Sequence, residues 1–291
     1  MSATVLITII SLSLLALVSA VILYFIAQKF KIYEDPRIDE IQALLPAANC
    51  GGCGFAGCRN FAEALVKAES FNGLNCPVGG GPVMELAANL LGKEAHPADP
   101  LVAVLLCNGT PEFRPRTSIY DGPSDCRISN NLYRGDTDCR YGCMGYGDCV
   151  RACTFDAMYM DSTSRLPVIA DDKCLACGAC VKACPRGLIE LRKKAKKDRK
   201  IYVACSNCDK GGPARRACKV ACTGCSKCLK VCAFDAITIE NNLAYIDAKK
   251  CTFCRKCVQE CPTNSILEFN FPSRKTKGEV QNETVTDNQF V

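Results

Sequence analysis

The chain has 291 residues, of which 25 are cysteine, and a formal net charge of +6 at pH 7. This length allows two or three small domains. In a short secreted protein so many cysteines would indicate a disulfide scaffold. Here they recur in runs of nearly constant C-x2-C-x2-C-x3-C spacing, in which neighbouring thiols converge on one inorganic core. The runs argue against disulfides and predict reducing surroundings for this part of the chain.

The N-terminal segment, residues 1–28, is predicted to be a transmembrane helix. It has no charged side chain, and Leu, Ile, Val and Ala dominate residues 5–27. About 20 such residues span a bilayer. A cleaved signal peptide, the alternative, carries basic residues before a shorter apolar core, whereas here Lys29 and Lys31 follow the apolar run. The positive-inside tendency then predicts a single-pass protein with everything after the span in the cytoplasm.

Residues 29–92 are predicted to be a small cluster-binding domain around a glycine-rich motif. The motif has the spacing C-x2-C-x4-C-x17-C and consists of Cys50, Cys53, Cys58 and Cys76. Four thiolates are enough for one [4Fe–4S] cluster, and the glycines let the backbone wrap tightly around it. Apolar residues at helical spacing predict helices at 59–68 and 84–91, the second ending at Gly92. A zinc knuckle is the alternative.

Residues 93–135 are predicted to be a linker that lets the parts on either side of it swing. Within it, residues 101–106 form an apolar, strand-like run that ends at Cys107. Cys107 and Cys126 belong to no four-cysteine motif. We predict that both are buried structural thiols, since free cysteine is often simply part of a core.

The C-terminal half contains an internal repeat of two modules, residues 136–204 and 205–270. Each module has two cysteine runs, and three of these four runs keep the C-x2-C-x2-C-x3-C spacing of bacterial two-cluster ferredoxins. A pair of short strands is predicted between the runs of each module, at 158–170 and at 237–246. The predicted fold class is therefore α+β: one transmembrane helix, a small cluster-binding domain and two tandem bacterial-type 2[4Fe–4S] ferredoxin modules.

In such ferredoxins the fourth cysteine of each run binds the cluster of the other run, which predicts crossed ligand sets. In the first module one set is Cys139, Cys143, Cys149 and Cys184. Its partner set is Cys153, Cys174, Cys177 and Cys180. In the second module the sets are Cys222, Cys225, Cys228 and Cys261, and Cys232, Cys251, Cys254 and Cys257. With the motif at 50–76, five [4Fe–4S] clusters and twenty ligands are predicted. The first run is stretched to C-x3-C-x5-C-x3-C, and its inserted residues could shift a ligand.

Three further cysteines lie between the modules: Cys205, Cys208 and Cys218. Structural packing and a role as an extra or alternative ligand are both open for them. The basic run from Arg192 to Lys200 (RKKAKKDRK) is either a solvated hairpin tip or a docking patch for a small acidic electron carrier. Residues 271–291 are polar and charged and are predicted to be a disordered tail.

The charge of the loaded protein differs from that of the bare chain. Four thiolates around a 2+ core leave about two negative charges, so five clusters would remove about ten and make the protein mildly acidic. The positive charge of the bare chain is therefore no evidence for a nucleic-acid partner, and none is expected. A zinc-stabilised scaffold is a second class of protein that C-x2-C pairs allow. Four long runs in tandem favour electron transfer, for which no catalytic acid, base or nucleophile is needed.

The span, the glycine-rich motif and the two modules, in this order, resemble the B subunits of the Rnf complexes over roughly residues 1–270. The resemblance rests mainly on residues 50–58 (CGGCGFAGC), 139–149 (CRYGCMGYGDC), 209–211 (DKG) and 218–222 (CKVAC). The stretched run is typical of this family, and so the resemblance supports the ligand set that contains it.

The resemblance implies an ion-translocating complex of the bacterial inner membrane that couples electron transfer between reduced ferredoxin and NAD to Na⁺ or H⁺ translocation. In that family the B subunit accepts electrons from ferredoxin, and the basic run from Arg192 to Lys200 is one candidate docking site for it here. It relays them to a membrane-embedded iron–sulfur site on its neighbours, the A, C, D, E and G subunits. Flavin and nicotinamide chemistry belongs to those subunits, in keeping with the lack here of a G-x-G-x-x-G fingerprint. The alternative is an iron–sulfur electron-transfer subunit of another membrane-bound reductase.

Overall fold

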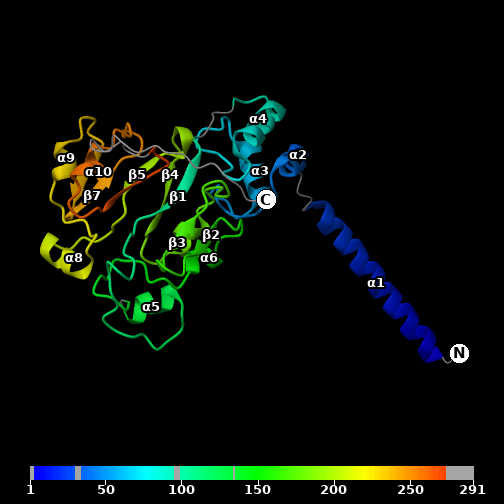
Figure 1. Ribbon diagram of the computed structural model, residues 1–291. Coiled ribbons are helices and arrows are strands. Elements are labelled where there is room, and N and C mark those ends of the chain that lie inside the picture. The colour runs from blue at the N-terminus through cyan, green and yellow to red at the C-terminus, as the bar shows by residue number, and fades with distance from the viewer. Residues whose placement is uncertain (1–2, 30–33, 95–98, 134, 273–291) are drawn as a thin grey trace, which may run out of the picture.

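The computed structural model describes residues 3–29, 34–94, 99–133 and 135–272. Helix α1 (Ala3–Lys29) projects away from the rest of the chain (Figure 1). Its stretch Ile9–Lys29 is exposed and is long and apolar enough to cross a membrane. The hydroxyls of Ser13 and Ser19 each donate to a backbone carbonyl one turn earlier, at 2.8 Å, so they leave no unsatisfied polar group in lipid. The segment predicted to span the membrane is thus one continuous helix.

A small domain of three helices follows: α2 (Arg37–Leu44), α3 (Cys58–Lys67) and α4 (Gly80–Leu91). Ile41, Phe61 and Leu65 are buried at its centre. The helix predicted at 59–68 is confirmed as α3, shifted by one residue. Helix α4 begins at Gly80, earlier than predicted, and stops at Gly92, whose φ of 65° is the left-handed conformation that glycine adopts most readily.

The first ferredoxin module contains two antiparallel strand pairs. The predicted pair consists of β2 (Met158–Met160) and β3 (Pro167–Ile169), with helices α6 (Asp148–Arg151) and α7 (Ala179–Ala183). The other pair is β1 (Leu101–Leu105) with β4 (Ile189–Lys193). Strand β1 and helix α5 (Cys126–Leu132) fall in the expected linker, 93–135. This part of the expected linker is instead built into the module, because its apolar run pairs with β4 and becomes buried.

The second module repeats this arrangement. The predicted pair consists of β6 (Ile237–Glu240) and β7 (Leu243–Ile246), with helices α9 (Lys227–Lys230) and α10 (Lys256–Glu260). Asn241 and Asn242 form the turn between the strands, both with positive φ. The other pair is β5 (Lys200–Val203) with β8 (Ile266–Phe269), and α8 (Gly211–Ala217) lies between β5 and the first run. The predicted boundary at residue 204 placed β5 in the first module, yet β5 pairs with β8 of the second module. The predicted tail lies outside the described residues from 273 onward.

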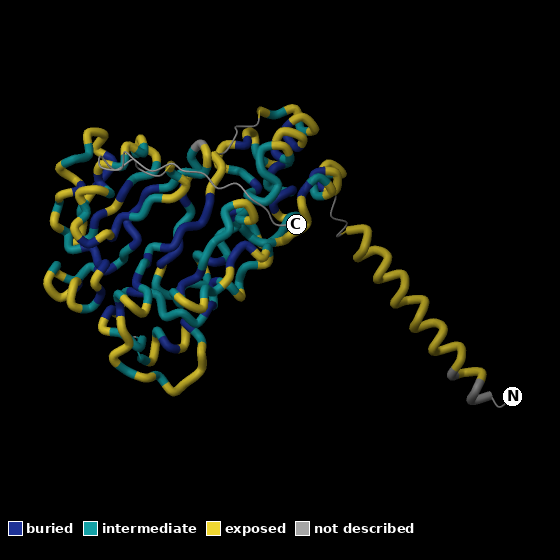
Figure 2. Tube along the Cα trace, in the orientation of Figure 1, coloured by how far each residue is buried: buried dark blue, intermediate teal, exposed yellow. Residues whose placement is uncertain are grey.

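The two modules pack against each other beside their outer strands. Val104 of β1 shares one buried cluster with Tyr202 of β5 and with Ala204, and the amide of Asn108 donates to the carbonyl of Ala204 at 3.0 Å. Buried backbone runs through this central region in Figure 2. Packing of this kind argues against free swinging of the modules about residues 93–135. The domain boundaries themselves stay predictions.

The basic run from Arg192 to Lys200 connects β4 to β5. It passes through the short 3-10 helix η1 (Lys196–Asp198). Arg192 is only 4% exposed and lies over the rings of Tyr202 and Tyr245, at 5.7 and 5.0 Å from their centroids. Lys200 pairs with Asp171 at 2.6 Å, and two more lysines of the run are ion-paired. The interpretation of the whole run as a solvated tip is therefore wrong, because both of its ends are held between packed strands.

Candidate metal centres

The four cysteines of the glycine-rich motif line one cavity: Cys50, Cys53, Cys58 and Cys76. The Cys76 thiol accepts a hydrogen bond from the amide of Gly79 at 3.3 Å, and burial raises the pKa of Cys76. Gly51 and Gly54 have φ values of 66° and 88°, which a side chain would strain. Helix α3 starts at Cys58 and returns the chain towards Cys76. Four thiols around one cavity fit the ligand set of a [4Fe–4S] cluster.

Three of the four predicted ferredoxin sets converge in the same way. One cavity of the second module is lined by Cys222, Cys225, Cys228 and Cys261. Another is lined by Cys232, Cys251, Cys254 and Cys257. In the first module, burial raises the pKa of Cys180 to about 11, and the nearby thiols of Cys174, Cys177 and Cys153 add to this effect. These four thiols therefore lie close together. Each set takes one cysteine from the other run, as crossed ligation requires.

The stretched run is where the structure departs from the predicted sets. Its cavity is lined by Cys126, Cys143, Cys149 and Cys184, and not by Cys139. The carboxylate of Asp148 accepts the amide of Cys126 at 3.0 Å and holds α5 at this cavity. The inserted residues carry Cys139 into a separate buried cluster that contains Cys218. The stretched spacing signalled an irregular run, but no spacing in the sequence indicates that Cys126 lines its cavity.

Burial raises the pKa of several of these thiols above its ordinary value. Burial, followed by the charges of neighbouring thiols, raises the pKa of Cys149 and Cys257 to about 12. Cys261 differs, because hydrogen bonds with Ser265 and Thr263 lower its pKa although burial opposes them. The positive iron core is what stabilises the thiolates, so cluster binding must release protons.

The cysteine sets fit a core of several iron atoms better than a single ion. In the part of the chain that the structure describes, no group of three or more Cys, His, Asp or Glu side chains is placed to hold one metal ion. A zinc site would need four ligands within about 2.3 Å of the ion. Here the thiols stand around cavities instead, which is the arrangement that a [4Fe–4S] core needs.

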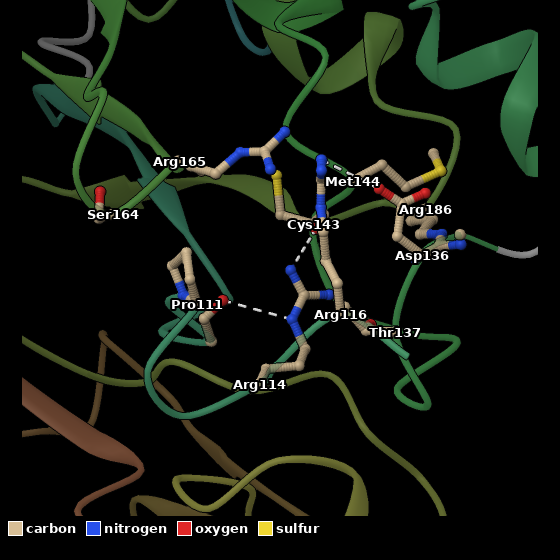
Figure 3. A pocket seen from close by; sticks show the side chains of 12 residues that line it. Pro111, Arg114, Arg116, Asp136, Thr137, Cys143, Met144, Ser164, Arg165 and Arg186 are labelled. Atoms are coloured by element: carbon tan, nitrogen blue, oxygen red, sulfur yellow. Dashed lines mark hydrogen bonds and ion pairs between the residues drawn. The ribbon is translucent and has the colours of Figure 1, made fainter. Parts of the chain in front are cut away.

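Arginine side chains surround the stretched run. Figure 3 shows Arg114, Arg116 and Arg186 around Cys143, in a cavity of about 110 Å³. Arg114 is only 9% exposed, and its guanidinium donates to the carbonyl of Cys143. Arg186 donates to the carbonyl of Gly142, and burial lowers its pKa. Fixed positive charge here favours the more negative, reduced state of a neighbouring cluster. No motif in the sequence marks these arginines.

The three-helix domain that follows α1, called the membrane-proximal domain from here on, touches the first module through the loop that carries Cys50 and Cys53. The ammonium of Lys182 lies 3.5 Å from the carbonyl of Gly51. A Cβ at Gly52 would lie 2.8 Å from the carbonyl of Cys177, so only glycine allows this approach. The thiols of Cys50 and Cys177 are close enough to interact electrostatically. The cysteine set of the glycine-rich motif therefore adjoins a set of the first module.

Within each module the two sets also adjoin. The Cys149 thiol interacts with that of Cys180 in the first module, and the Cys257 thiol with that of Cys228 in the second. The exposed cysteines are Cys225 and Cys254, both in the second module. The sets thus run from an exposed end of the second module towards the domain that follows the span. Fold and sites together define a membrane-anchored iron–sulfur electron carrier.

Comparison with known proteins gives the family. A family model described as "Putative Fe-S cluster" matches residues 45–78, and models described as "4Fe-4S dicluster domain" match residues 138–189 and 221–265.

The B subunit of a sodium-translocating ferredoxin:NAD(+) oxidoreductase complex from Acetobacterium woodii is 41% identical, over 88% of this chain and 75% of the relative. A proton-translocating counterpart from Clostridium ljungdahlii is 40% identical, over 84% of each chain. The B subunit of an ion-translocating oxidoreductase complex from Methanosarcina acetivorans is 38% identical, over 79% of this chain and 85% of the relative. The chain belongs to this family of B subunits, which confirms the Rnf resemblance.

Proposed function

We propose that the chain relays electrons from reduced ferredoxin to redox subunits in the membrane, as the B subunit of an ion-translocating ferredoxin:NAD oxidoreductase. The observation that carries this proposal is the succession of cysteine sets from the exposed end of the second module to the domain after α1. The partners are the A, C, D, E and G subunits, and the transfer drives Na⁺ or H⁺ across the membrane. Because α1 carries no charge before Lys29, other subunits provide the ion path.

The cofactors that fit the sets are [4Fe–4S] clusters, each of which takes up and releases single electrons when bound. The chain's own residues bind them through thiolates, shield them from water and adjust their potentials through hydrogen bonds to sulfur. The amides of Gly79 and Phe253 donate to Cys76 and Cys251, at 3.3 and 3.5 Å. In the stretched run we propose Cys126 as the ligand in place of Cys139.

Ferredoxin docks, in this proposal, on the second module rather than on the run from Arg192 to Lys200. Cys225 and Cys254 are exposed there, so a partner reaches these ligands directly. Four exposed lysines lie close to them in sequence: Lys227, Lys230, Lys249 and Lys250. The described ion pairs include none of these four, so their charge is available to an acidic carrier.

The cluster domains lie on the cytoplasmic side of the membrane in this proposal. Lys29 at the C-terminal end of α1 supports this side, since basic residues flank membrane spans on the cytoplasmic face. Buried thiols that must stay reduced for cluster assembly support the same side. Protease added to sealed inside-out vesicles should remove the cluster domains, whereas protease outside intact spheroplasts should not.

The experiment that tests the relay is Cys53→Ala in the purified complex, with Cys208→Ala as the matched control. Loss of the membrane-proximal ligand should abolish ferredoxin-dependent NAD reduction, while ferredoxin still reduces the clusters of the two modules. The control should keep both activities. Normal turnover in Cys53→Ala would remove this site from the path. Co-purification with subunits of another reductase, and without a flavin-bearing partner, would favour the alternative function.

A further inference from the structure

Five cysteines lie outside the four-thiol sets described above: Cys107, Cys139, Cys205, Cys208 and Cys218. We propose that four of them form a sixth [4Fe–4S] site between the two ferredoxin modules: Cys107, Cys139, Cys205 and Cys218. With this site, six sets of four take 24 of the 25 cysteines, and only Cys208 is left over.

The four thiols converge from three separate segments of the chain. Cys139 and Cys218 belong to one buried cluster, and Cys205 packs against it. Cys107, just beyond the end of β1, interacts electrostatically with each of the other three thiols. Core cysteines that serve only packing have no reason to gather in a group of four. A cluster core gives that reason, since it needs four thiolates at one place.

A buried amide side chain is directed at these sulfurs. Asn207 is completely buried, and its Nδ2 donates to the Cys139 sulfur at 3.7 Å. The backbone amide of Asn207 donates to the Cys205 sulfur at 3.4 Å. Phe253 makes the same backbone contact, from two residues further on, to Cys251 of the second module. Hydrogen bonds of this kind hold ligand sulfurs in place and tune a cluster.

A buried positive charge faces the same thiols. Arg114 is 9% exposed and donates to the carbonyls of Gly109 and Cys143, and no carboxylate pairs with it among the described residues. Its charge acts on Cys139 and Cys218. A buried guanidinium requires a compensating negative charge. Four thiolates around a 2+ core leave about two negative charges, which neutral thiols cannot supply.

Cys208 does not share this environment. Its thiol donates back to the carbonyl of Ser206 at 3.7 Å, and it is not part of the buried cluster that holds Cys139 and Cys218. Although Cys205 and Cys208 form a C-x2-C pair in sequence, the fold separates their roles. Cys208 is therefore a matched control, a cysteine of the same segment that ligates nothing in this proposal.

The proposed site adjoins a set of each module. Cys107 accepts the amide of Cys143 at 3.4 Å, and Cys143 belongs to a first-module set. Cys205 accepts the amide of Cys222 at 3.3 Å, and Cys222 belongs to a second-module set. An electron received from one neighbour is passed to the other, with no bond or proton transferred. The site would thus lie between a set of the first module and a set of the second.

Iron and sulfide content per chain tests this inference. The unaltered chain and Cys208→Ala should each hold about 24 irons, and Cys107→Ala and Cys218→Ala about 20. The two variants should also lose one spin per chain from the electron paramagnetic resonance signal after dithionite reduction. In both, ferredoxin should still reduce the second module, while reduction of the first module slows at least tenfold.

Equal iron in all four proteins, or zinc in place of the missing iron, would overturn the sixth site. If the variants fail to fold and lose far more than about four irons, the unaltered chain decides: about 24 irons support the site, and about 20 refute it. A failure here leaves the ferredoxin relay standing, because that relay is tested separately by Cys53→Ala.

Discussion

Arg192 is the residue at which sequence and structure predict opposite phenotypes. In the sequence it begins a basic docking run. In the structure it lies on β4, pairs with Glu190, and reaches across to the second module, where its guanidinium lies over the rings of Tyr202 and Tyr245. It also donates to the carbonyl of Ile201 at 3.5 Å. We therefore expect Arg192→Ala to destabilise the contact between modules and to leave ferredoxin binding unchanged.

The magnitude follows from these contacts. Each ring contact of a cation contributes about 0.5–1 kcal/mol. Removing one partner of a fully buried ion pair costs about 3–5 kcal/mol, but the Glu190 side chain is 27% exposed and can be hydrated after the loss. A total of about 2–4 kcal/mol results, which lowers the unfolding midpoint of a chain of this size by roughly 3–8 °C.

The assay follows the visible absorption of the clusters during anaerobic heating of the purified chain in detergent. Lys197→Ala is the matched control, since Lys197 is an exposed cation of the same run. The control should keep the midpoint of the unaltered chain. An unchanged midpoint for Arg192→Ala, together with a raised KM for ferredoxin, would refute the structural interpretation and restore the run as a docking patch.

Three further outcomes are expected. Reversing Lys227 and Lys230 to Glu should raise the KM for ferredoxin roughly three- to tenfold at low salt, and less at high salt, as measured by steady-state reduction; reversal of Lys197 should have no such effect. Cys126→Ala should lower the iron content by about four per chain, because its thiol completes the stretched-run cavity; unchanged iron would return Cys126 to a structural role. Leu65→Ala, at a completely buried position, should cost about 2–5 kcal/mol and release the membrane-proximal cluster at lower denaturant concentration than in the unaltered chain.

Local features of the fold were predictable because they depend on neighbouring residues. Helix α3 follows from apolar residues at helical spacing, and the β6–β7 pair follows from alternating residues around Asn241 and Asn242. The pairing of β1 with β4 joins residues about ninety positions apart. No local pattern fixes such a partner, and so β1 was taken as part of a linker.

The metal centres divide in the same way. Runs with regular spacing identify their own ligands, since the cluster dictates how many residues separate its thiolates. Cys126 and Cys107 have no such spacing. Their positions depend on helix α5 being held by Asp148 and on β1 being paired, which are tertiary contacts.

The sequence by itself determined the class of the protein: a single apolar helix, cysteine runs for [4Fe–4S] clusters, and membership of a family. Spacing and composition carry that information because helix formation and cluster ligation are short-range. Only the tertiary structure decided that Arg192 lies between modules, that Cys126 and not Cys139 lines the cavity of the stretched run, and that Cys139 meets Cys107 and Cys218. Those placements arise from burial between distant segments, where packing and charge compensation act across the fold.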